Sequence, residues 1–285
     1  MIRKIDPEPF IVCGKKRALT NFSAPSAERC LSILELLVDE PEGMPMSLIA
    51  QRLSLPVSAT HRLLAVLVQK RYVRQDAISE RYRPTMLLAA LGLRLVENTS
   101  LTETCQPILE DLAQQVEELV RLAVREDEDL IWVAKAQGAK NSIRYDPISG
   151  HRATLHATAM GKAWLSTLDE DQAVSLVEQL GYGGALVGPN AIRSSAELRE
   201  QLRLTRERGF AIVEEEAEIG ISAIACIVRD NTAPKRPVVG AISIGGPSFR
   251  LSRERLVGFR DPLLEAARHL SDIWPARRHK SRQVA

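Results

Sequence analysis

"LPVSATHRLLAVLVQKRYVR", residues 55 to 74, predicts a helix whose two faces differ in chemistry. Pro56 is tolerated in the first turn of a helix, so the helix is expected to begin after it and to run to about Lys70. At helical spacing the buried face comprises Thr60, Leu63, Leu64 and Leu67. The outward residues near the leading end are Ser58, Ala59, His61 and Arg62. The helix is therefore expected to pack along one side and to present small and cationic groups on the other.

Two shorter helices and a hairpin are expected around this helix. From Ser26, apolar residues recur at helical spacing as far as "DEPEGMP", and they are Leu31, Ile33, Leu34, Leu36 and Leu37. Ser47 is expected to cap the next helix, which ends at "SLP". After the third helix, "YVRQDAISERYRPT" alternates around a polar turn, as a small hairpin closed by Pro84 does. Residues 26–84 are thus expected to form one compact unit of three helices and a hairpin.

Positive charge is concentrated in this unit. The whole chain has a formal net charge of only +2, so any electrostatic signal must be regional. Between residues 52 and 83 the cations are Arg52, Arg62, Lys70, Arg71, Arg74, Arg81 and Arg83, against the anions Asp76 and Glu80. A helix that begins with small polar residues fits the major groove of DNA, and flanking cations hold the phosphates.

Double-stranded DNA is therefore the expected partner of this unit. The residues expected at DNA are Ser47, Ser58, Ala59, Thr60, His61, Arg62, Arg71 and Arg81. Two alternatives remain on spacing alone, because trihelical units also bind proteins and exposed cations are often only solvated. His61 fits a packing or solvent-facing position as well as it fits a base contact.

The remaining sequence predicts an α+β domain at residues 100–275. Residues 85–99 form an apolar linker helix, interrupted only by Arg94 and Glu97, that a second subunit is expected to cover. The expected strands are "ELVRLAVRE", "DLIWVAKAQ", "NSIRYDP", "GFAIVEE", "SAIACIVRD" and "RPVVGAISIGG". The expected helices are "ATAMGKAWLSTL", "DEDQAVSLVEQL", "AELREQLRLTRERG" and the segment 252–274. The strands should pair as hairpins in an antiparallel sheet covered by helices. Residues 1–25 are expected to be a disordered basic arm and residues 276–285 a disordered tail.

Four stretches carry a resemblance to one protein family. "SAERCLSILELLVDEPEGMPMSLIAQRLSLPVSATHRLLAVLVQKRYVR" resembles the winged helix-turn-helix of the IclR (isocitrate lyase regulator) family of bacterial transcription factors. "SGHRATLHATAMGKAWLS", "RERGFAIVEEEAEIGISAIACIVRD" and "VVGAISIGGPSFRL" resemble motifs of its ligand-binding domain, in the family's order. The resemblance covers residues 26 to 274. It implies a GAF-like effector domain, a homodimer or dimer of dimers, and promoter binding controlled by a small metabolite.

Three positions depart from the family pattern. Val57 stands where the family often has lysine, and Ala59 stands where it often has a hydroxyl residue. Ala59 could instead contact a thymine methyl group. Gly245 replaces a serine of many members, which removes a possible hydrogen bond to the ligand. The operator and the effector of a relative therefore cannot simply be transferred.

An effector pocket is expected around "LHATAMGKAW", where small residues lead into a helix. Backbone N–H groups at the start of a helix suit an anion, and strands from "ISAIACIV" and "GAISIGG" should complete the pocket. The predicted effector-binding residues are Leu155, Ala159, Met160, Gly161, Glu214, Ser222, Ala223, Ile224 and Ser243, with Ile242 as a further wall. This combination predicts a small organic acid. In the alternative, the small residues only let a helix pack closely on a sheet, and Gly161 is the first candidate for that role.

Neither a catalytic site, nor a metal site, nor a cofactor is predicted. A phosphate-binding loop at Gly161 lacks its first glycine and has Ala163 where a hydroxyl residue is needed. Cys226 and His156 could be imagined as nucleophile and base, but an apolar strand favours an inert thiol. The acidic run "EEEAE" could bind a cation with His151 or His156, although a solvated turn is the preferred interpretation. The scattered cysteines and the lack of a signal peptide or a long apolar segment predict a soluble cytoplasmic protein away from membranes.

Overall fold

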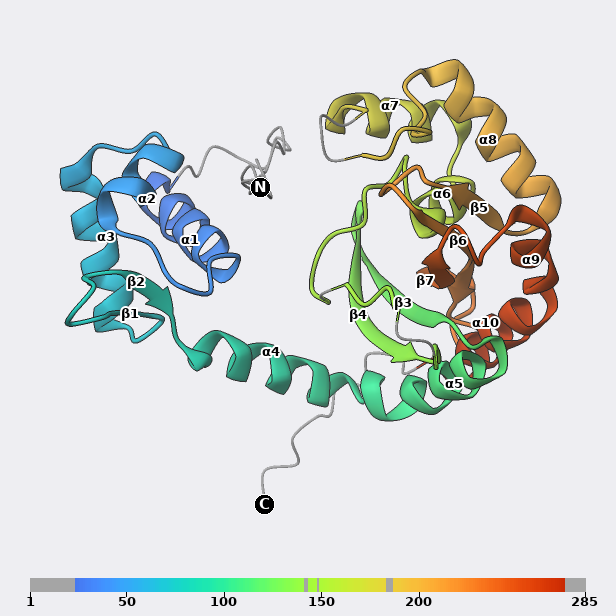
Figure 1. Cartoon of the computed structure of the whole chain (residues 1–285), viewed down its shortest axis with the longest axis horizontal. Coiled ribbons are helices and arrows are strands. Elements are labelled where there is room, and N and C mark those ends of the chain that lie inside the picture. Colours follow the sequence, from blue (N-terminus) through green and yellow to red (C-terminus); the bar gives the residue numbers. More distant parts are fainter. Residues whose placement is uncertain (1–23, 141–142, 148, 183–186, 275–285) are drawn as a thin grey trace. The chain divides into compact units, whose positions relative to one another are not determined.

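The computed structural model describes residues 24–140, 143–147, 149–182 and 187–274. The chain divides between Asn98 and Thr99 into two compact units, and each is described separately (Figure 1). The arm and tail predicted at the chain ends, apart from residues 24 and 25, lie outside the described residues.

The N-terminal unit contains the predicted three helices and hairpin. Its elements are α1 (Pro25–Val38), α2 (Met46–Arg52), α3 (Val57–Gln69), β1 (Val73–Gln75), β2 (Tyr82–Pro84) and α4 (Met86–Thr99), the last of which reaches the domain boundary. Leu64 of α3 packs with Ile33 and Leu37 of α1, Ile49 of α2 and Tyr82 of β2 in one apolar core. Because the core uses one face of each helix, the opposite face of α3 is left at the surface.

The C-terminal unit is built on a five-stranded antiparallel sheet of order β4-β3-β7-β6-β5. The strands are β3 (Leu119–Glu126), β4 (Asp129–Gln137), β5 (Ala211–Glu214), β6 (Ile221–Arg229) and β7 (Val238–Pro247). The helices are α5 (Leu101–Val116), α6 (Ala159–Leu165), α7 (Glu170–Leu180), α8 (Ser195–Arg208), α9 (Arg253–Gly258) and α10 (Arg260–Ile273). The predicted α+β class is confirmed.

The two faces of this sheet are covered by different helices (Figure 1). Large side chains such as Ile242 and Ile244 of β7 pack with α5 and α10. The intervening small residues, such as Ala241 of β7 and Ala225 of β6, pack with α6 and its neighbours. Side chains alternate along a strand, so each strand divides its residues between an α5/α10 face and an α6 face.

Two segments differ from the prediction. Helix α5 was not predicted, although its buried residues Leu101, Cys105, Leu109, Leu112 and Val116 have helical spacing. The strand predicted at "NSIRYDP" is wrong for the described part, because residues 143–147 have no strand pairing. Tyr145 in this segment instead places its ring 5.6 Å from the guanidinium of Arg121.

Candidate nucleic-acid interface and effector site

The leading end of α3 exposes the side chains that could reach DNA. Pro56 is the N-cap residue of the helix, and Ser58, His61 and Arg62 are exposed while Ala59 is half-buried. Thr60 has no exposed surface, and its hydroxyl donates to the carbonyl oxygen of Pro56 at 3.1 Å. The expectation that Thr60 contacts DNA is therefore wrong, because its side chain points into the unit.

Helix α2 begins differently from the prediction. Its N-cap residue is Pro45, without a side-chain hydrogen bond, and Ser47 is the second residue of the helix. Ser47 therefore does not cap α2. Its side chain is nevertheless exposed, so the residue remains available to a partner.

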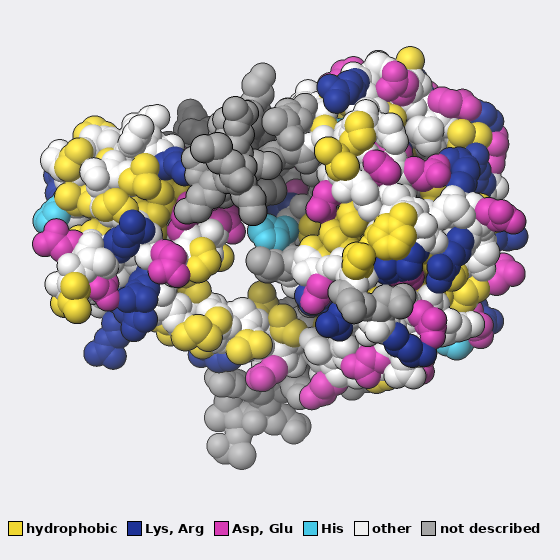
Figure 2. Space-filling view, in the orientation of Figure 1, with side chains coloured by type: hydrophobic (Ala, Val, Ile, Leu, Met, Phe, Trp, Pro, Cys, Tyr) yellow, Lys and Arg dark blue, Asp and Glu magenta, His cyan; other side chains and the backbone are white. Residues whose placement is uncertain are grey.

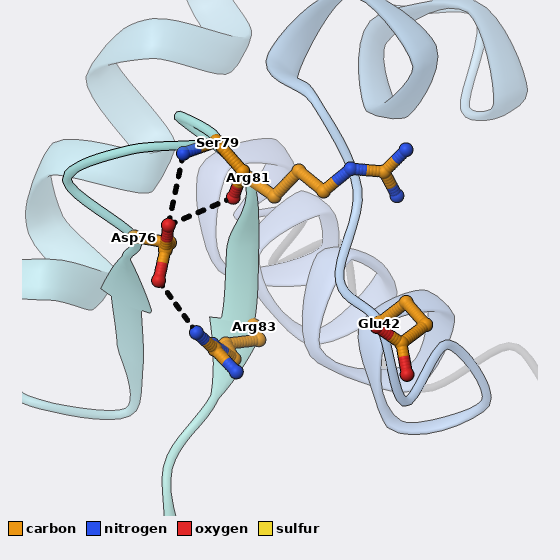
Figure 3. Close-up of a pocket in the computed structure, with 5 residues that line it drawn as sticks. All are labelled: Glu42, Asp76, Ser79, Arg81 and Arg83. Carbon is orange, nitrogen blue, oxygen red and sulfur yellow. Dashed lines mark hydrogen bonds and ion pairs between the residues drawn. The ribbon is translucent and has the colours of Figure 1, made fainter.

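The hairpin β1–β2 forms a wing whose tip is held by Asp76 (Figure 3). The carboxylate accepts hydrogen bonds from the N–H groups of Ile78 and Ser79 and from the Ser79 hydroxyl, and it pairs with Arg83 at 2.7 Å. These contacts, with the Ser79 N–H first, hold the pKa of Asp76 well below its usual range. The wing thus has a fixed turn with Ile78 at its tip, 96% exposed.

Arg81 is fixed on the other side of the wing. Its guanidinium donates to the carbonyl oxygen of Gly43 at 2.8 Å, which joins the wing to the loop before α2. Arg81 also lines a surface pocket of about 490 Å³ together with Glu42, Asp76, Ser79 and Arg83 (Figure 3). The Arg81 side chain is nevertheless exposed, so it remains available to a partner.

Several cations of the N-terminal unit have no carboxylate partner among the described residues. They are Arg52, Arg62, Lys70, Arg71 and Arg74, and all but the half-buried Arg52 are exposed. Figure 2 shows Lys and Arg side chains gathered on the N-terminal unit near the hairpin. An unpaired cation at a surface can neutralise a phosphate without breaking an internal ion pair, so this face suits a polyanion.

Helix α6 is held tightly inside the C-terminal unit. All seven of its residues are buried, and the hydroxyl of Thr158 accepts a hydrogen bond from the Gly161 N–H at 3.1 Å. A Cβ atom at Gly161 would lie 2.2 Å from the carbonyl oxygen of Leu155. The prediction that Gly161 offers a donor and a space to the ligand is therefore wrong: its N–H is occupied and its missing side chain permits close packing.

The predicted effector residues lie on both faces of the sheet. Ala223 and Ser243 belong to the α6 face, because Ser243 pairs in register with Ala225 of the core under α6. Ile224 and Ile242 belong to the core under α5 and α10. Ser222 alternates with Ala223, and its hydroxyl lies 3.0 Å from that of Ser248. A single pocket cannot use both sets, so Ser222, Ile224 and Ile242 are removed from the predicted pocket.

Glu214 and Glu216 also differ from the prediction. Glu214 pairs in register with Ser222 on the α9 side of the sheet, and its carboxylate pairs with Arg253 at 2.5 Å. Glu214 is therefore not placed to accept from a ligand beside α6. The acidic run is not simply a solvated turn, because Glu216 is buried and pairs at 2.5 Å with Lys162, which has no exposed surface. Burial lowers the pKa of Lys162, and the carboxylate of Glu216 opposes that shift.

A cluster on the α6 face was missed by the sequence prediction. The Arg121 guanidinium lies 4.1 Å from the ring centre of Trp132 and 5.6 Å from that of Tyr145. The indole N–H of Trp132 donates to the sulfur of Met160 at 3.3 Å. The sequence feature that could have indicated this cluster is Arg121, the one charged residue in the apolar stretch "LVRLAV". It was overlooked because a charge on a strand is usually solvated.

The residues tested as catalytic or metal-binding do not come together. The Cys226 thiol faces the carbonyl oxygen of Leu263 at 3.8 Å on the α10 side, and burial raises its pKa to about 12. His156 instead lies edge-on to Tyr182 with ring centres 5.6 Å apart. Within the described ranges, no group of three or more His, Cys, Asp or Glu side chains is arranged to hold a metal ion. None of the helices described there is long and apolar enough to cross a membrane.

Two family models match this chain in succession. The IclR helix-turn-helix domain matches residues 26–77, and the model described as the bacterial transcriptional regulator IclR C-terminal domain matches residues 93–272. The chain belongs to the IclR family. It is therefore a transcriptional regulator with a helix-turn-helix domain followed by an effector-binding domain.

Known IclR-family proteins are similar over nearly the whole chain. The HTH-type transcriptional repressor AllR of Escherichia coli K12 is 28% identical over 93% of this chain and 96% of its own length. The transcriptional repressor IclR of the same strain is 29% identical over 90% of this chain and 94% of its own length. The HTH-type transcriptional regulator KdgR of Dickeya chrysanthemi is 29% identical over 88% of this chain and 80% of its own length.

Solved IclR-family structures share the fold. A regulator from Alicyclobacillus acidocaldarius matches with a TM-score of 0.74 and 23% identity, covering 88% of this chain and 98% of its own. An IclR homologue from Microbacterium hydrocarbonoxydans, solved with 4-hydroxybenzoate, matches with a TM-score of 0.67 and 23% identity, covering 86% and 97%. At this identity the likeness establishes the fold alone.

Proposed function

We propose that this IclR-family regulator binds operator DNA as a homodimer, or as a dimer of dimers, and that a small organic acid changes that binding. The observation that carries the DNA part is the exposed leading end of α3 beside a fixed wing, with unpaired cations around it. Base contacts are assigned to Ser58, Ala59 and Arg62, and phosphate contacts to Arg71 and Arg81. Ser47 and His61 flank this face. Such a regulator acts in the cytoplasm, where bacterial DNA lies.

The dimer is proposed from α4. No residue of this helix is buried within the chain, and Met86, Leu93 and Leu95 are 79%, 62% and 68% exposed. Hydrophobic side chains of this segment lie at the surface (Figure 2). A helix this apolar is unfavourable in water, and a second copy would cover it. Two subunits would also supply two recognition helices for two half-sites.

The effector part of the proposal rests on the α6 face of the sheet. Leu155, Ala159, Met160, Ala223 and Ser243 lie there, so the revised pocket keeps these five predicted residues. A solved neighbour holds 4-hydroxybenzoate, and the inducer-binding domain of PobR from Acinetobacter, with a TM-score of 0.54, was solved with 3-hydroxybenzoic acid. The PobR domain in that structure is a double mutant. Both ligands are small organic acids, which supports the same class here.

An enzymatic function is not proposed. The buried thiol of Cys226 and the ring of His156 pack in different surroundings, so they do not form a nucleophile and base. The matched relatives named above as repressors act on transcription.

The test is binding of the full chain to its own upstream intergenic DNA, measured by fluorescence anisotropy with and without small carboxylic and aromatic acids. We expect tight binding that weakens steeply with salt, and a change in affinity with at least one acid. Leu91→Glu, within α4, should weaken both assembly in light scattering and operator binding, whereas Glu97→Gln on the same helix should not. A wild-type monomer at micromolar concentration, or salt-independent binding, would contradict the proposal.

A further inference from the structure

Arg121 is a half-buried cation, and one donor at its buried end is unused. Its Nη1 atom is buried and has no hydrogen-bond partner among the residues that the structure describes. Burial lowers the pKa of Arg121, and Tyr145 and Glu218 only partly oppose that shift. An arginine has five N–H donors and stays protonated, so the unmatched donor leaves positive charge directed into the protein.

The guanidinium is held in place by aromatic rings rather than by a carboxylate pair. Trp132 and Tyr145 flank it at 4.1 and 5.6 Å, and burial raises the pKa of Tyr145 to about 12, so its phenol stays neutral. In contrast, the buried Lys162 pairs with the carboxylate of Glu216, and the half-buried Arg250 pairs with that of Glu118. Stacking orients the plane of a guanidinium but leaves its edge available for a bidentate partner.

Arg121 lies at the pocket inferred above. It is directly opposite Ser243 in the pairing of β3 with β7, so the two side chains share the α6 face. Trp132, which stacks on Arg121, also donates to Met160 of α6. Of the five residues kept for the effector, Ser243 is therefore the strand partner of Arg121, and Met160 contacts the same tryptophan as Arg121 does.

We propose that Arg121 binds the carboxylate of the effector, with the Ser243 hydroxyl as a second donor and Trp132 and Tyr145 as the aromatic walls of the site. This inference rests on the proposed function and narrows it, because the effector must then be an anion and not merely a small polar molecule. A buried donor without a partner costs stability until an acceptor pairs with it, so a carboxylate that accepts from Nη1 would be bound favourably.

The test uses calorimetry on the full chain with benzoate, 4-hydroxybenzoate, succinate and pyruvate, each compared with its uncharged amide. For wild type we expect at least one acid to bind, and its amide to bind at least tenfold more weakly. Arg121→Gln should lower the affinity for the acid at least tenfold and abolish the difference in affinity between the acid and its amide. Arg121→Lys should recover only part of the affinity, because an ammonium lacks the planar fork of the guanidinium.

The matched control is Arg125→Gln, four residues along the same strand, where the arginine is exposed and donates to the carbonyl oxygen of Asp127. It should bind the acid like wild type. The melting temperature of ligand-free Arg121→Gln should equal or exceed that of wild type, whereas a purely structural arginine would lower it when removed. If the variant does not fold, the structural role is supported and the assignment of Arg121 to the ligand is overturned.

Two results separate the inference from the proposed function. An acid that binds wild type and Arg121→Gln equally would overturn the role of Arg121 and leave the regulator proposal intact. Binding of none of the acids to wild type would overturn both the carboxylate class and the role of Arg121, while operator binding would still test the DNA part independently.

Discussion

Two groups of cations, one in each unit, have opposite surroundings. In the N-terminal unit Arg62, Arg71 and Arg74 are exposed and pair with no carboxylate in the described chain. In the C-terminal unit Lys162 and Arg250 are paired with buried carboxylates at 2.5 and 2.9 Å. The difference indicates that the first group is available to an external polyanion, whereas the second group joins elements of its own unit. Arg121 of the C-terminal unit differs from both groups, since it is half-buried and its buried Nη1 atom has no partner among the described residues.

Helices α3 and α6 show the same division. Each has a threonine near its start whose hydroxyl bonds to backbone, Thr60 in α3 and Thr158 just before α6. Helix α3 packs on one face and exposes Ser58 and Arg62, whereas α6 is buried along its whole length. A threonine held to backbone at the start of a helix therefore does not decide whether the helix exposes one face or is buried throughout.

The largest effect should come from breaking the ion pair of Lys162 with Glu216. Glu216→Gln leaves a buried ammonium without its partner, and removing one member of a buried pair costs about 3–5 kcal/mol of unfolding free energy. Urea denaturation monitored by tryptophan fluorescence measures the change. The double variant Lys162→Met/Glu216→Leu should recover most of the loss.

A matched surface control sharpens that result. Glu207 pairs with Arg203 at 2.5 Å, and both side chains are more than half exposed. Glu207→Gln should change stability little, because exposed pairs are screened by water. Equal losses of unfolding free energy for Glu207→Gln and Glu216→Gln would show that the buried ion pair contributes no more to stability than the exposed one.

A smaller effect is expected from an unpaired cation of the N-terminal unit. Arg62→Ala should cost about 1–3 kcal/mol of binding free energy on the operator and less on random DNA, since a base contact is lost only at the cognate sequence. Fluorescence anisotropy on both DNAs gives the comparison, and folding should be unchanged. Arg268→Ala, at an exposed position of α10, serves as the control. Equal losses on both DNAs would reduce Arg62 to a phosphate contact.

The smallest effect should come from the wing carboxylate, Asp76. Its pKa is lowered in the folded state, so its contribution to stability is present above the unfolded pKa and is lost as pH falls through the folded value. Asp76→Asn should therefore lower the melting temperature slightly at pH 7, with the difference narrowing below about pH 4. Operator binding should tighten slightly, because Arg83 loses its partner and a negative charge leaves the wing. A melting difference that does not depend on pH would contradict the assigned ionisation.

Much of the molecule could be predicted from the sequence because it depends on short-range patterns. Helical spacing predicted α1, α3 and the buried face of α3 that includes Leu63, and alternation predicted every strand of the sheet. The outward position of Arg62 followed from the same spacing. Ser47 was misassigned as a cap because Pro45 is the N-cap residue and the helix begins at Met46. Helix α5 was overlooked although the spacing of its apolar residues is helical.

Local sequence determined which elements form and which end of α3 is polar, since each depends on residues a few positions apart. Alternation within β6 could already have separated Ser222 from Ala223. Only the tertiary structure decided that Ser243 of β7 shares its face with Arg121 and not with Ser222, because the pairing register relates strands that are distant in the sequence. Tertiary structure also decided the pairing of Lys162 with Glu216, 54 residues apart, and the stacking of Arg121 on Trp132. Burial and partnership depend on which surfaces meet after folding, and that meeting determines whether a charge is solvated, paired or left to bind a ligand.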